Sequence, residues 1–297
     1  MLTFQSPRLE DKEWVRELFS YSQFQGCEYT FGNLYIWNPV YGSKIARFED
    51  FFVSKSTGVK PSYVFPAGRG DLGKVIHAMR ADAHESGRPF RLHGVTKANQ
   101  AALEAVLPGA FEYRPYRDGF DYIYNTQDLI NLSGRKYHGK RNHIAYFQKN
   151  YDWRYEPITT ANIDDCMRMN AEWERDNLSR NPEGISEELA AIHRAFDHYF
   201  ELGFTGGLIR ADGRVVAYTV GEEATDNTFC THIEKAFADV RGAYPIINRE
   251  FAANALGKYT FVNREEDMGE EGLRKAKLSY YPAILLEKQD ALYREDL

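Results

Sequence analysis

Predicted strands and helices alternate along this chain, and the same order occurs twice. Residues 62–124 are predicted to form strand, helix, strand, helix and strand, and residues 228–287 repeat that order. A pair of predicted strands precedes each run. Such alternation is typical of α/β folds, in which helices cover the faces of a sheet. We expect an α/β fold with mixed sheets (α+β) and two tandem domains packed together, residues 1–128 and residues 129–297.

Two Asp-Gly pairs mark tight turns between predicted strands. Asp118-Gly119 predicts a hairpin over residues 111–124, and Asp212-Gly213 predicts another over residues 206–221. Asp-Gly between apolar runs is among the strongest local signals for a hairpin.

A strand–helix–strand unit with short connections follows the second hairpin. The strands are predicted at residues 228–233 and 259–262, and the helix at residues 245–256. Strands joined in this way through a helix are usually parallel neighbours in one sheet. We expect the same arrangement here.

Composition excludes several classes of protein. The net charge of −6 argues against a protein that coats nucleic acid over its whole surface, although it allows a local basic patch. Three scattered cysteines favour a reducing compartment and argue against a disulfide framework or a cysteine-rich metal site. The chain has no run of about 18 apolar residues, and Met1–Gln5 lack the features of a signal peptide. We expect a cytoplasmic protein with no transmembrane segment and no bound metal.

A glycine-rich segment lies between a predicted strand and a predicted helix. Residues 68–75 satisfy G-x-G-x-x-G, but His93 and Gly94 stand where a dinucleotide fold places an acid for the ribose. The same residues nearly match a P-loop, but Val75 replaces the hydroxyl residue that holds magnesium. Two interpretations stay open: a site for a cofactor phosphate, and a turn that caps a helix.

A basic segment without any acid covers residues 130–150. A predicted helix over residues 135–149 places Lys136, Lys140 and His143 on one face. Such a face suits a polyanion such as tRNA, although a solvated helix face is equally compatible with the pattern. The candidate nucleic-acid-binding residues are Arg135, Lys136, Lys140 and Arg141.

The strand predicted at residues 228–235 carries ionisable side chains. Simple alternation places Cys230, His232 and Glu234 on one face. A histidine and a carboxylate two residues apart could transfer protons, so His232 and Glu234 are the catalytic candidates. The alternative is a surface ion pair on a half-exposed strand.

Charged side chains also follow the strand predicted at residues 259–262. Because loops after parallel strands meet at one edge of a sheet, we expect these side chains to share one cleft with His232 and Glu234. The alternative is a closed network of ion pairs, in which Arg264, Lys235 and Lys277 answer the acids Glu234, Glu265 and Asp267. The candidate substrate-binding residues are Asn263, Arg264, Glu265, Asp267, Lys277 and Lys235.

These motifs together resemble the soluble bacterial proteins of the phosphatidylglycerol lysyltransferase C-terminal domain family. The resemblance covers most of the chain. The motifs that carry it are Phe31–Trp37, Gly134–His143, the His-Ile-Glu-Lys strand from His232, the Gly-Ala-Tyr turn from Gly242, Asn263–Asp267 and Gly272–Tyr280.

The resemblance implies two tandem GNAT-type acyltransferase folds, related to peptidyl transferases that use aminoacyl-tRNA. It implies a transferase that passes an aminoacyl group to an amine, a hydroxyl or a lipid headgroup, with tRNA as a partner. In that interpretation Glu234 or His232 removes the acceptor's proton, and Arg264 or Lys277 holds the acyl carbonyl or a carboxylate. Glu265 and Asp267 would hold the α-ammonium.

Two alternatives accompany the resemblance. Acetyl-CoA users of this fold hold pyrophosphate with a Q/R-x-x-G-x-G/A turn, and residues 239–244 break that pattern at both ends. An aminoacyl-tRNA donor therefore agrees better with the sequence, although Gly68–Gly70 leaves an acyl-CoA donor open in the first half. The other alternative is a catalytically silent module that binds a small anionic or amino-acid-like ligand.

Overall fold

The chain forms two compact units, each with its own sheet. The computed structural model describes residues 2–58, 61–177 and 182–297. The first unit contains Met1–Tyr122, Glu265–Lys277 and Ile284–Leu297, and the second contains Ile123–Arg264 and Leu278–Ala283. This division differs from a single boundary after residue 128, because two segments of the C-terminal half lie in the first unit.

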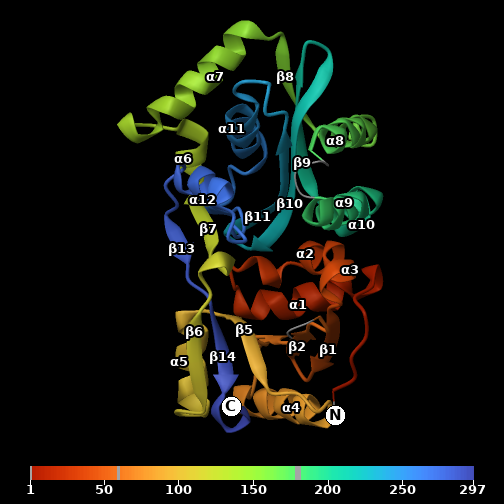
Figure 1. Cartoon of the computed structure of the whole chain (residues 1–297), viewed down its shortest axis with the longest axis vertical. Helices are drawn as coiled ribbons and strands as arrows, with labels where there is room; N and C mark the ends of the chain where they lie inside the picture. Colours follow the sequence, from red (N-terminus) through yellow and green to blue (C-terminus); the bar gives the residue numbers. More distant parts are fainter. Residues whose placement is uncertain (1, 59–60, 178–181) are drawn as a thin grey trace. The chain divides into compact units, whose positions relative to one another are not determined.

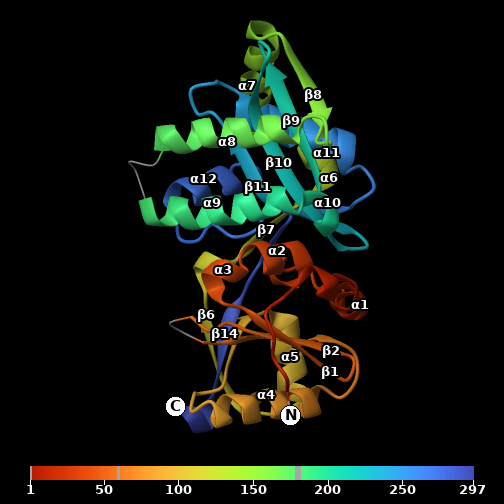
Figure 2. The same ribbon diagram turned by 90° about the vertical axis from the view of Figure 1, so that its right-hand side faces the viewer.

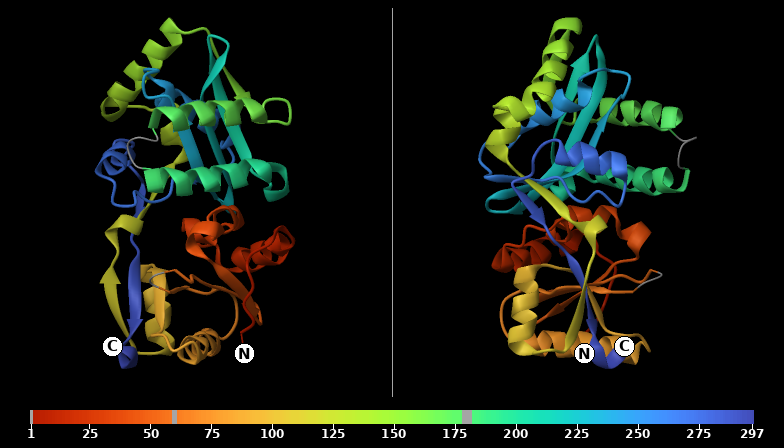
Figure 3. Two further views of the ribbon diagram at one scale, coloured as in Figure 1. Left: turned by 45° about the vertical axis from the view of Figure 1, so that its right-hand side comes forward. Right: turned by 60° about the vertical axis from the view of Figure 1, so that its left-hand side comes forward.

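The first unit is built on a mixed sheet with the strand order β1-β2-β3-β5-β14-β6, and β4 pairs with β2. Its strands are β1 (Lys44–Phe48), β2 (Phe51–Lys55), β3 (Tyr63–Val64), β4 (Ala67–Gly68), β5 (Arg91–Val95), β6 (Phe111–Pro115) and β14 (Gln289–Tyr293). Its helices are α1 (Lys12–Ser22), α2 (Phe31–Ile36), α3 (Asn38–Tyr41), α4 (Leu72–Glu85) and α5 (Lys97–Val106). The C-terminal strand β14 lies between β5 and β6 and is antiparallel to both (Figure 3).

Alternation along β2 gives this sheet two apolar faces. Phe51 and Val53 belong to the core cluster that also contains Met79 of α4 and Leu103 of α5. Phe52 points the other way, and its ring meets Phe19 of α1 with the centroids 4.7 Å apart. A strand that is buried on both faces needs such a continuous apolar run.

The second unit is built on a sheet that includes the strand order β7-β12-β11-β10-β9-β8. Its strands are β7 (Asp121–Asn125), β8 (Trp153–Pro157), β9 (Thr205–Ala211), β10 (Arg214–Thr225), β11 (Thr228–Ala236) and β12 (Phe261–Asn263). Its helices are α6 (Thr126–Asn131), α7 (His138–Asn150), α8 (Ile163–Asn177), α9 (Pro182–Asp197), α10 (Tyr199–Leu202) and α11 (Ala243–Ala255). Figures 1 and 2 show α8 and α9 over one face of this sheet, and α11 with α7 on the other.

The strands β11 and β12 are parallel neighbours, as the sequence predicts. They are paired from Thr228 and Phe261 to Cys230 and Asn263. At that point β12 ends, while β11 continues to Ala236. The sheet therefore opens beside the second half of β11, and the loop after β12 begins at this opening.

One of the two predicted hairpins is correct. The strands β9 and β10 are antiparallel and turn at Asp212-Gly213. The hairpin predicted over residues 111–124 is wrong, because β6 pairs with β14 while β7 pairs with β12 in the other sheet. A 3-10 turn at Arg117–Gly119 separates β6 from β7. The Asp118 carbonyl accepts from Met268 N at 3.1 Å, which ties this turn to the loop after β12.

The predicted alternation along β11 is also wrong. Ile233 lies opposite Val220, but Thr231 lies opposite Gly221, so His232 is an extra residue in a β-bulge. A bulge reverses which face the residues beyond it occupy. Cys230 and Glu234 consequently lie on opposite faces of the sheet.

The remaining regular elements are helix α12 (Glu271–Leu278) and the short strand β13 (Ile284–Leu286). Across residues 2–58, 61–177 and 182–297, the structure contains no helix with the length and apolar character needed to cross a bilayer.

Candidate functional site

Glu234 and Arg264 form an ion pair where the sheet of the second unit opens. Arg264 Nη2 lies 2.6 Å from Glu234 Oε1, and both side chains are almost buried, with 12% and 13% of their surface exposed. The other carboxylate oxygen accepts from Asn248 Nδ2 of α11 at 3.3 Å. Glu234 therefore faces α11, and both of its oxygens have partners.

Aromatic rings surround Arg264. Its Cζ lies 4.9 Å from the ring centre of Tyr280 and 5.6 Å from that of Tyr124. Burial alone would lower the pKa of Arg264, but Glu234 and these two tyrosines raise it above its ordinary value. The guanidinium is therefore charged at every physiological pH.

Lys140 of α7 reaches the same tyrosine. Its Nζ lies 3.9 Å from the ring centre of Tyr280. Burial, and then the charge of Arg264, lower the pKa of Lys140 to about 8, although Glu234 acts in the opposite direction. Lys140 is thus half-buried beside the Glu234–Arg264 pair.

The other basic residues of this segment have different surroundings. Arg135 and Lys136 are exposed in a 3-10 turn before α7, and Lys136 Nζ lies 3.9 Å from an Asp128 oxygen. Arg141 donates to the carbonyls of Leu132 and Gly134 at 2.5 and 2.7 Å. The four predicted nucleic-acid-binding residues therefore have different surroundings. Arg135 and Lys136 are exposed, Arg141 binds two loop carbonyls, and Lys140 is half-buried against Tyr280.

His232 lies on the opposite face of the sheet from Glu234. Its side chain is fully buried, its Nε2 is 3.0 Å from Glu222 Oε1, and its ring is 5.6 Å from that of Phe204. The bulge turns it toward this partner. His232 and Glu234 are therefore no proton-transfer pair within this sheet.

Lys235 and Asn263 are also buried in the second unit. Lys235 Nζ lies 2.7 Å from Glu188 Oε2 and 3.7 Å from the ring centre of Trp173. Burial lowers the pKa of Lys235, and Glu188 counteracts this effect. Asn263 has no exposed surface and ends the pairing of β12 with β11 and β7.

Asp267 is the centre of an ion-pair network in the first unit. It has no exposed surface. It accepts from Arg274 at 2.8 and 2.9 Å, Arg117 at 3.0 Å, Tyr122 at 2.5 Å and the Gly269 amide at 2.9 Å. Burial alone would raise the pKa of Asp267, but these donors hold it well below its ordinary value. Asp267 thus belongs to a closed network, but its cations are Arg274 and Arg117 and not the predicted Arg264, Lys235 or Lys277.

Glu265 and Lys277 lie on either side of Asp267 in the chain, in the segment that follows β12. Glu265 adopts a left-handed backbone with φ of 57°, and its Oε1 accepts from Asn33 Nδ2 at 2.8 Å. Lys277 is nearly buried, and its ammonium donates to the Glu266 carbonyl. A non-glycine residue in this backbone conformation is strained, and such strain is commonest at functional sites.

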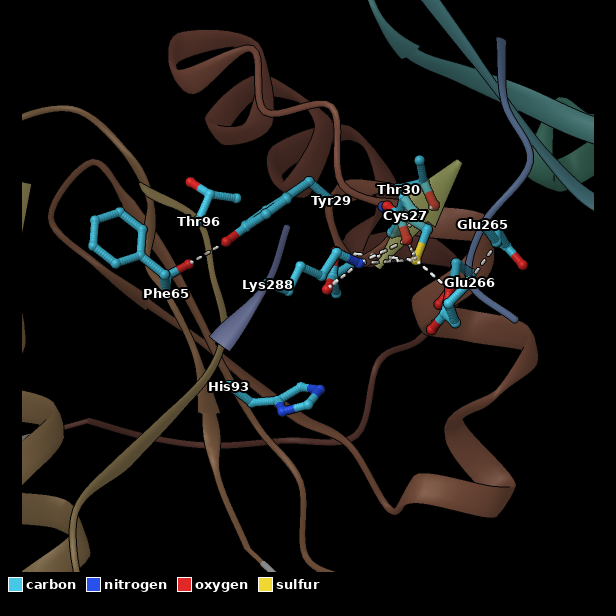
Figure 4. Close-up of polar contacts among 12 residues, drawn as sticks. Cys27, Tyr29, Thr30, Phe65, His93, Thr96, Glu265, Glu266 and Lys288 are labelled. Carbon is cyan, nitrogen blue, oxygen red and sulfur yellow. Dashed lines mark hydrogen bonds and ion pairs between the residues drawn. The ribbon is translucent and has the colours of Figure 1, made fainter. Parts of the chain in front are cut away.

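A second ionic cluster in the first unit was not among the residues singled out from the sequence. Lys288, only 2% exposed, lies 2.6 Å from Glu28 Oε1 and 2.8 Å from Asp121 Oδ1. The thiol of Cys27 donates to Glu266 Oε2 at 3.1 Å (Figure 4). Burial raises the pKa of Glu266 to about 7; Lys288 lowers it, and the nearby acids raise it further.

This cluster includes atoms of the kind that bind metals. Cys27, Glu28 and Asp121 each place a ligand-type atom within 4.8 Å of the others. The Lys288 ammonium already lies between the two carboxylates. The cation of this cluster is therefore the chain's own lysine. The residues of this cluster come from four distant segments of the chain. Its one signal in the sequence is a charged residue, Lys288, directly before the strand Gln289–Tyr293.

The glycine-rich segment is a helix cap. Asp71 accepts from the Lys74 amide at 3.1 Å and occupies the start of α4. Gly68 has a φ of 147°, and a Cβ there would lie 2.0 Å from the Asp50 carbonyl oxygen. The glycine therefore permits a close backbone approach, and a carboxylate already caps the helix where a phosphate would bind.

Helix α7 packs against the glycine that precedes α11. Gly242 caps α11 with a φ of 95°. A Cβ at this position would lie 2.5 Å from the His143 carbonyl oxygen and 2.9 Å from Phe147 Cβ. Two residues of α7 thus occupy the space against the turn between β11 and α11.

Comparison with known proteins gives a consistent result. The profile of the family described as phosphatidylglycerol lysyltransferase, C-terminal, matches residues 19–291. An uncharacterised protein of Mycoplasmoides gallisepticum is 23% identical over 175 residues, which cover 57% of this chain and 54% of that protein. The chain thus spans about half the length of the curated relative it matches.

Solved structures show the same fold. A conserved protein of unknown function from Bacteroides thetaiotaomicron has a TM-score of 0.94 and 39% identity, and covers 99% of this chain and 100% of its own. L-PGS from Bacillus licheniformis has a TM-score of 0.66 and 14% identity, over 98% and 93%. A tandem GNAT protein of clavulanic acid biosynthesis has a TM-score of 0.51 and 11% identity, over 98% of each chain. The fold therefore consists of two tandem GNAT-type units.

Proposed function

Because this chain belongs to the phosphatidylglycerol lysyltransferase C-terminal family, we propose that it transfers an aminoacyl group from aminoacyl-tRNA to an amine or hydroxyl acceptor. The observation that carries this choice of donor is the turn before α11, which contains Asp239 and in which Gly242 is packed against α7. A donor of this kind is made in the cytoplasm, so the reaction belongs there.

An acyl-CoA donor is the less suitable alternative in the second unit. Pyrophosphate binding at a helix start needs open backbone amides. Here His143 and Phe147 of α7 lie against Gly242. The turn also carries Asp239, whose charge would repel a phosphate. The capped start of α4 argues in the same way against a phosphate at Gly68–Gly70.

The opening between β11 and β12 would hold the reacting ester. The acceptor attacks the ester carbonyl, the bond to the ribose oxygen breaks, and the ribose hydroxyl leaves with a proton. Glu234 removes the proton of the acceptor, and Arg264 holds the carbonyl oxygen as negative charge develops on it. Both lie beside this opening and are largely shielded from water.

The remaining candidates have supporting roles in the proposal. The exposed residues Arg135 and Lys136 contact the tRNA backbone, where cations supply most of the affinity. The acceptor is a small molecule or a lipid headgroup.

A silent binding module is the second candidate. It is favoured by one observation, the mutual neutralisation of Glu234 and Arg264 at 2.6 Å. In that case the opening would bind a ligand without turnover.

Replacement of Glu234 by glutamine separates the two candidates. With tRNA charged with radiolabelled amino acids and a panel of amine and hydroxyl acceptors, the parent protein should move label to one acceptor. E234Q should be slower by about 10²–10⁴-fold, the usual loss of a general base. Retention of charged tRNA on a filter should stay within about twofold, and the thermal midpoint reports folding. Retention without any transfer by the parent protein would support the binding module instead.

A further inference from the structure

Helix α11 buries an asparagine on an otherwise apolar face. Asn248 is 7% exposed, and the other residues that the structure buries on this helix are Ala243, Ile246, Ile247, Phe251 and Ala252. This face packs on the sheet, since the rings of Phe251 and Phe229 of β11 have their centroids 5.6 Å apart. A buried amide is costly unless hydrogen bonds satisfy it. The position of Asn248 therefore calls for an explanation.

The amide of Asn248 is only half satisfied. Its Nδ2 donates to Glu234 Oε2 at 3.3 Å. The Glu234 carboxylate, paired with Arg264, offers only acceptors, so the amide must turn its NH2 group toward it and its carbonyl away. Within residues 2–58, 61–177 and 182–297, Asn248 Oδ1 is buried and has no hydrogen-bond partner. An unpaired buried acceptor destabilises a fold, so folding alone does not account for this asparagine.

The unpaired carbonyl belongs to the side chain that holds Glu234. Glu234 lies beyond the last paired residues of β11 and β12, where the sheet opens. Each carboxylate oxygen can accept more than one hydrogen bond, so Glu234 keeps room for a donor from a ligand. The Asn248 carbonyl is part of the same planar amide that contacts this carboxylate. One donor group bound at Glu234 can therefore also reach Asn248 Oδ1.

We propose that Asn248 selects an amine over a hydroxyl as the acceptor, an inference that rests on the proposed transfer reaction. The attacking nitrogen of a primary amine carries two hydrogens, and a hydroxyl oxygen carries one. Glu234 takes one hydrogen in either case. The second N–H of the amine donates to Asn248 Oδ1, which a hydroxyl leaves unpaired. Sites built to bind a particular hydrogen discriminate strongly against an analogue that lacks it.

The reaction balances with this assignment. The amine nitrogen forms a bond to the ester carbonyl carbon, and the bond from that carbon to the ribose oxygen breaks. The proton taken by Glu234 passes to the leaving ribose oxygen. The hydrogen held by Asn248 Oδ1 stays on the nitrogen and becomes the N–H of the amide product.

A matched pair of acceptors tests the selection. Glycerol and 3-amino-1,2-propanediol differ in one hydroxyl that is replaced by an amino group. Each is given to the full chain with tRNA charged with radiolabelled amino acids, and the reaction without protein is subtracted. Mild alkali hydrolyses ester products and leaves amide products, so the two are counted separately. We expect amide formation to exceed ester formation by at least about tenfold.

Two variants separate the two ends of the amide. N248L removes both ends at similar volume. Loss of the Nδ2 contact with Glu234 should slow both acceptors alike, whereas loss of Oδ1 should slow only the amine. The ratio of amide to ester product should therefore fall by at least about fivefold. N248D keeps an oxygen acceptor in this place and should keep the preference for the amine. Thermal midpoints report the folding of both variants.

The matched control is N254L, on the exposed side of the same helix. Asn254 Nδ2 donates to the Glu250 carbonyl at 2.8 Å, and its replacement should change the ratio by less than about twofold. A ratio unchanged in N248L, or lost equally in N248D, would overturn the inference and leave the transfer reaction standing. Ester formation equal to amide formation in the parent protein would do the same. Absence of transfer to either acceptor would overturn the proposed function and this inference together.

Discussion

Asp267 shows how a charged side chain in a loop can serve the fold rather than a ligand. It is fully buried and accepts from Arg274, Arg117 and Tyr122. D267N should lower the free energy of unfolding by about 2–4 kcal/mol, somewhat less than a wholly buried pair because both arginines are partly exposed. The control is D118N, which breaks the half-exposed contact with Arg274 and should cost less than about 1 kcal/mol. Equal losses of unfolding free energy in D267N and D118N, measured by urea unfolding, would contradict the central role of Asp267 in this network.

The same residue has a signature in acid. The pKa of Asp267 is lower in the folded chain than in the unfolded one. Its contribution to stability is therefore complete above about pH 4 and is lost as the pH falls further. Unfolding free energy measured from pH 5 to pH 3 should fall less steeply in D267N than in the parent protein. Parallel curves would contradict this prediction.

Glu266 should have the opposite pH dependence. Burial among acids raises its pKa to about 7, so the folded chain holds a proton that the unfolded chain releases near pH 4. Its effect on stability becomes less favourable as the pH rises from about 4.5 to 7. Relative to the parent, E266Q should gain unfolding free energy between pH 5 and pH 8. The exposed Glu270, changed to Gln, should show no such trend, and a flat difference for E266Q would refute the assignment.

At the scale of elements, hydrophobic patterns correctly predicted those strand pairings that depend on residues close together in the chain. The parallel pair β11 and β12 and the hairpin of β9 and β10 are as expected. The bulge at His232 could not be predicted, because β11 is buried on both faces and has no apolar alternation whose phase could shift. The turn at Arg117–Gly119 has a hairpin's sequence, but Met268 and Arg274, distant in the chain, determine its partners.

The packing of α7 on α11 gives a prediction at this scale. G242A places a Cβ 2.5 Å from the His143 carbonyl oxygen at a φ of 95°. It should lower unfolding free energy by about 1–3 kcal/mol, through backbone strain and displacement of α7. G139A in α7 is the control, because a Cβ there meets nothing within 4 Å. That change should stabilise by about 0.5–1 kcal/mol. Similar values for the two variants in thermal or urea unfolding would show that the close approach is not needed.

At the scale of the whole molecule, the repeated strand–helix order predicted the tandem fold, but not which segments make each unit. Strand β14 pairs in the first sheet, so Lys288 beside it meets Glu28 and Asp121 from much earlier in the chain. Sequence spacing carries no signal for contacts of this kind. For the same reason the predicted site residues fall in both units, with Glu234 and Arg264 in one and Glu265, Asp267 and Lys277 in the other.

A side-by-side comparison of donors tests the central claim most directly. The parent protein is given radiolabelled aminoacyl-tRNA or radiolabelled acetyl-CoA with the same panel of amine and hydroxyl acceptors, and label in the acceptor is counted over time. The account predicts transfer from aminoacyl-tRNA above the rate of spontaneous hydrolysis, and none from acetyl-CoA, because Asp239 in the turn before α11 would repel its pyrophosphate. Transfer from acetyl-CoA with none from aminoacyl-tRNA would contradict it.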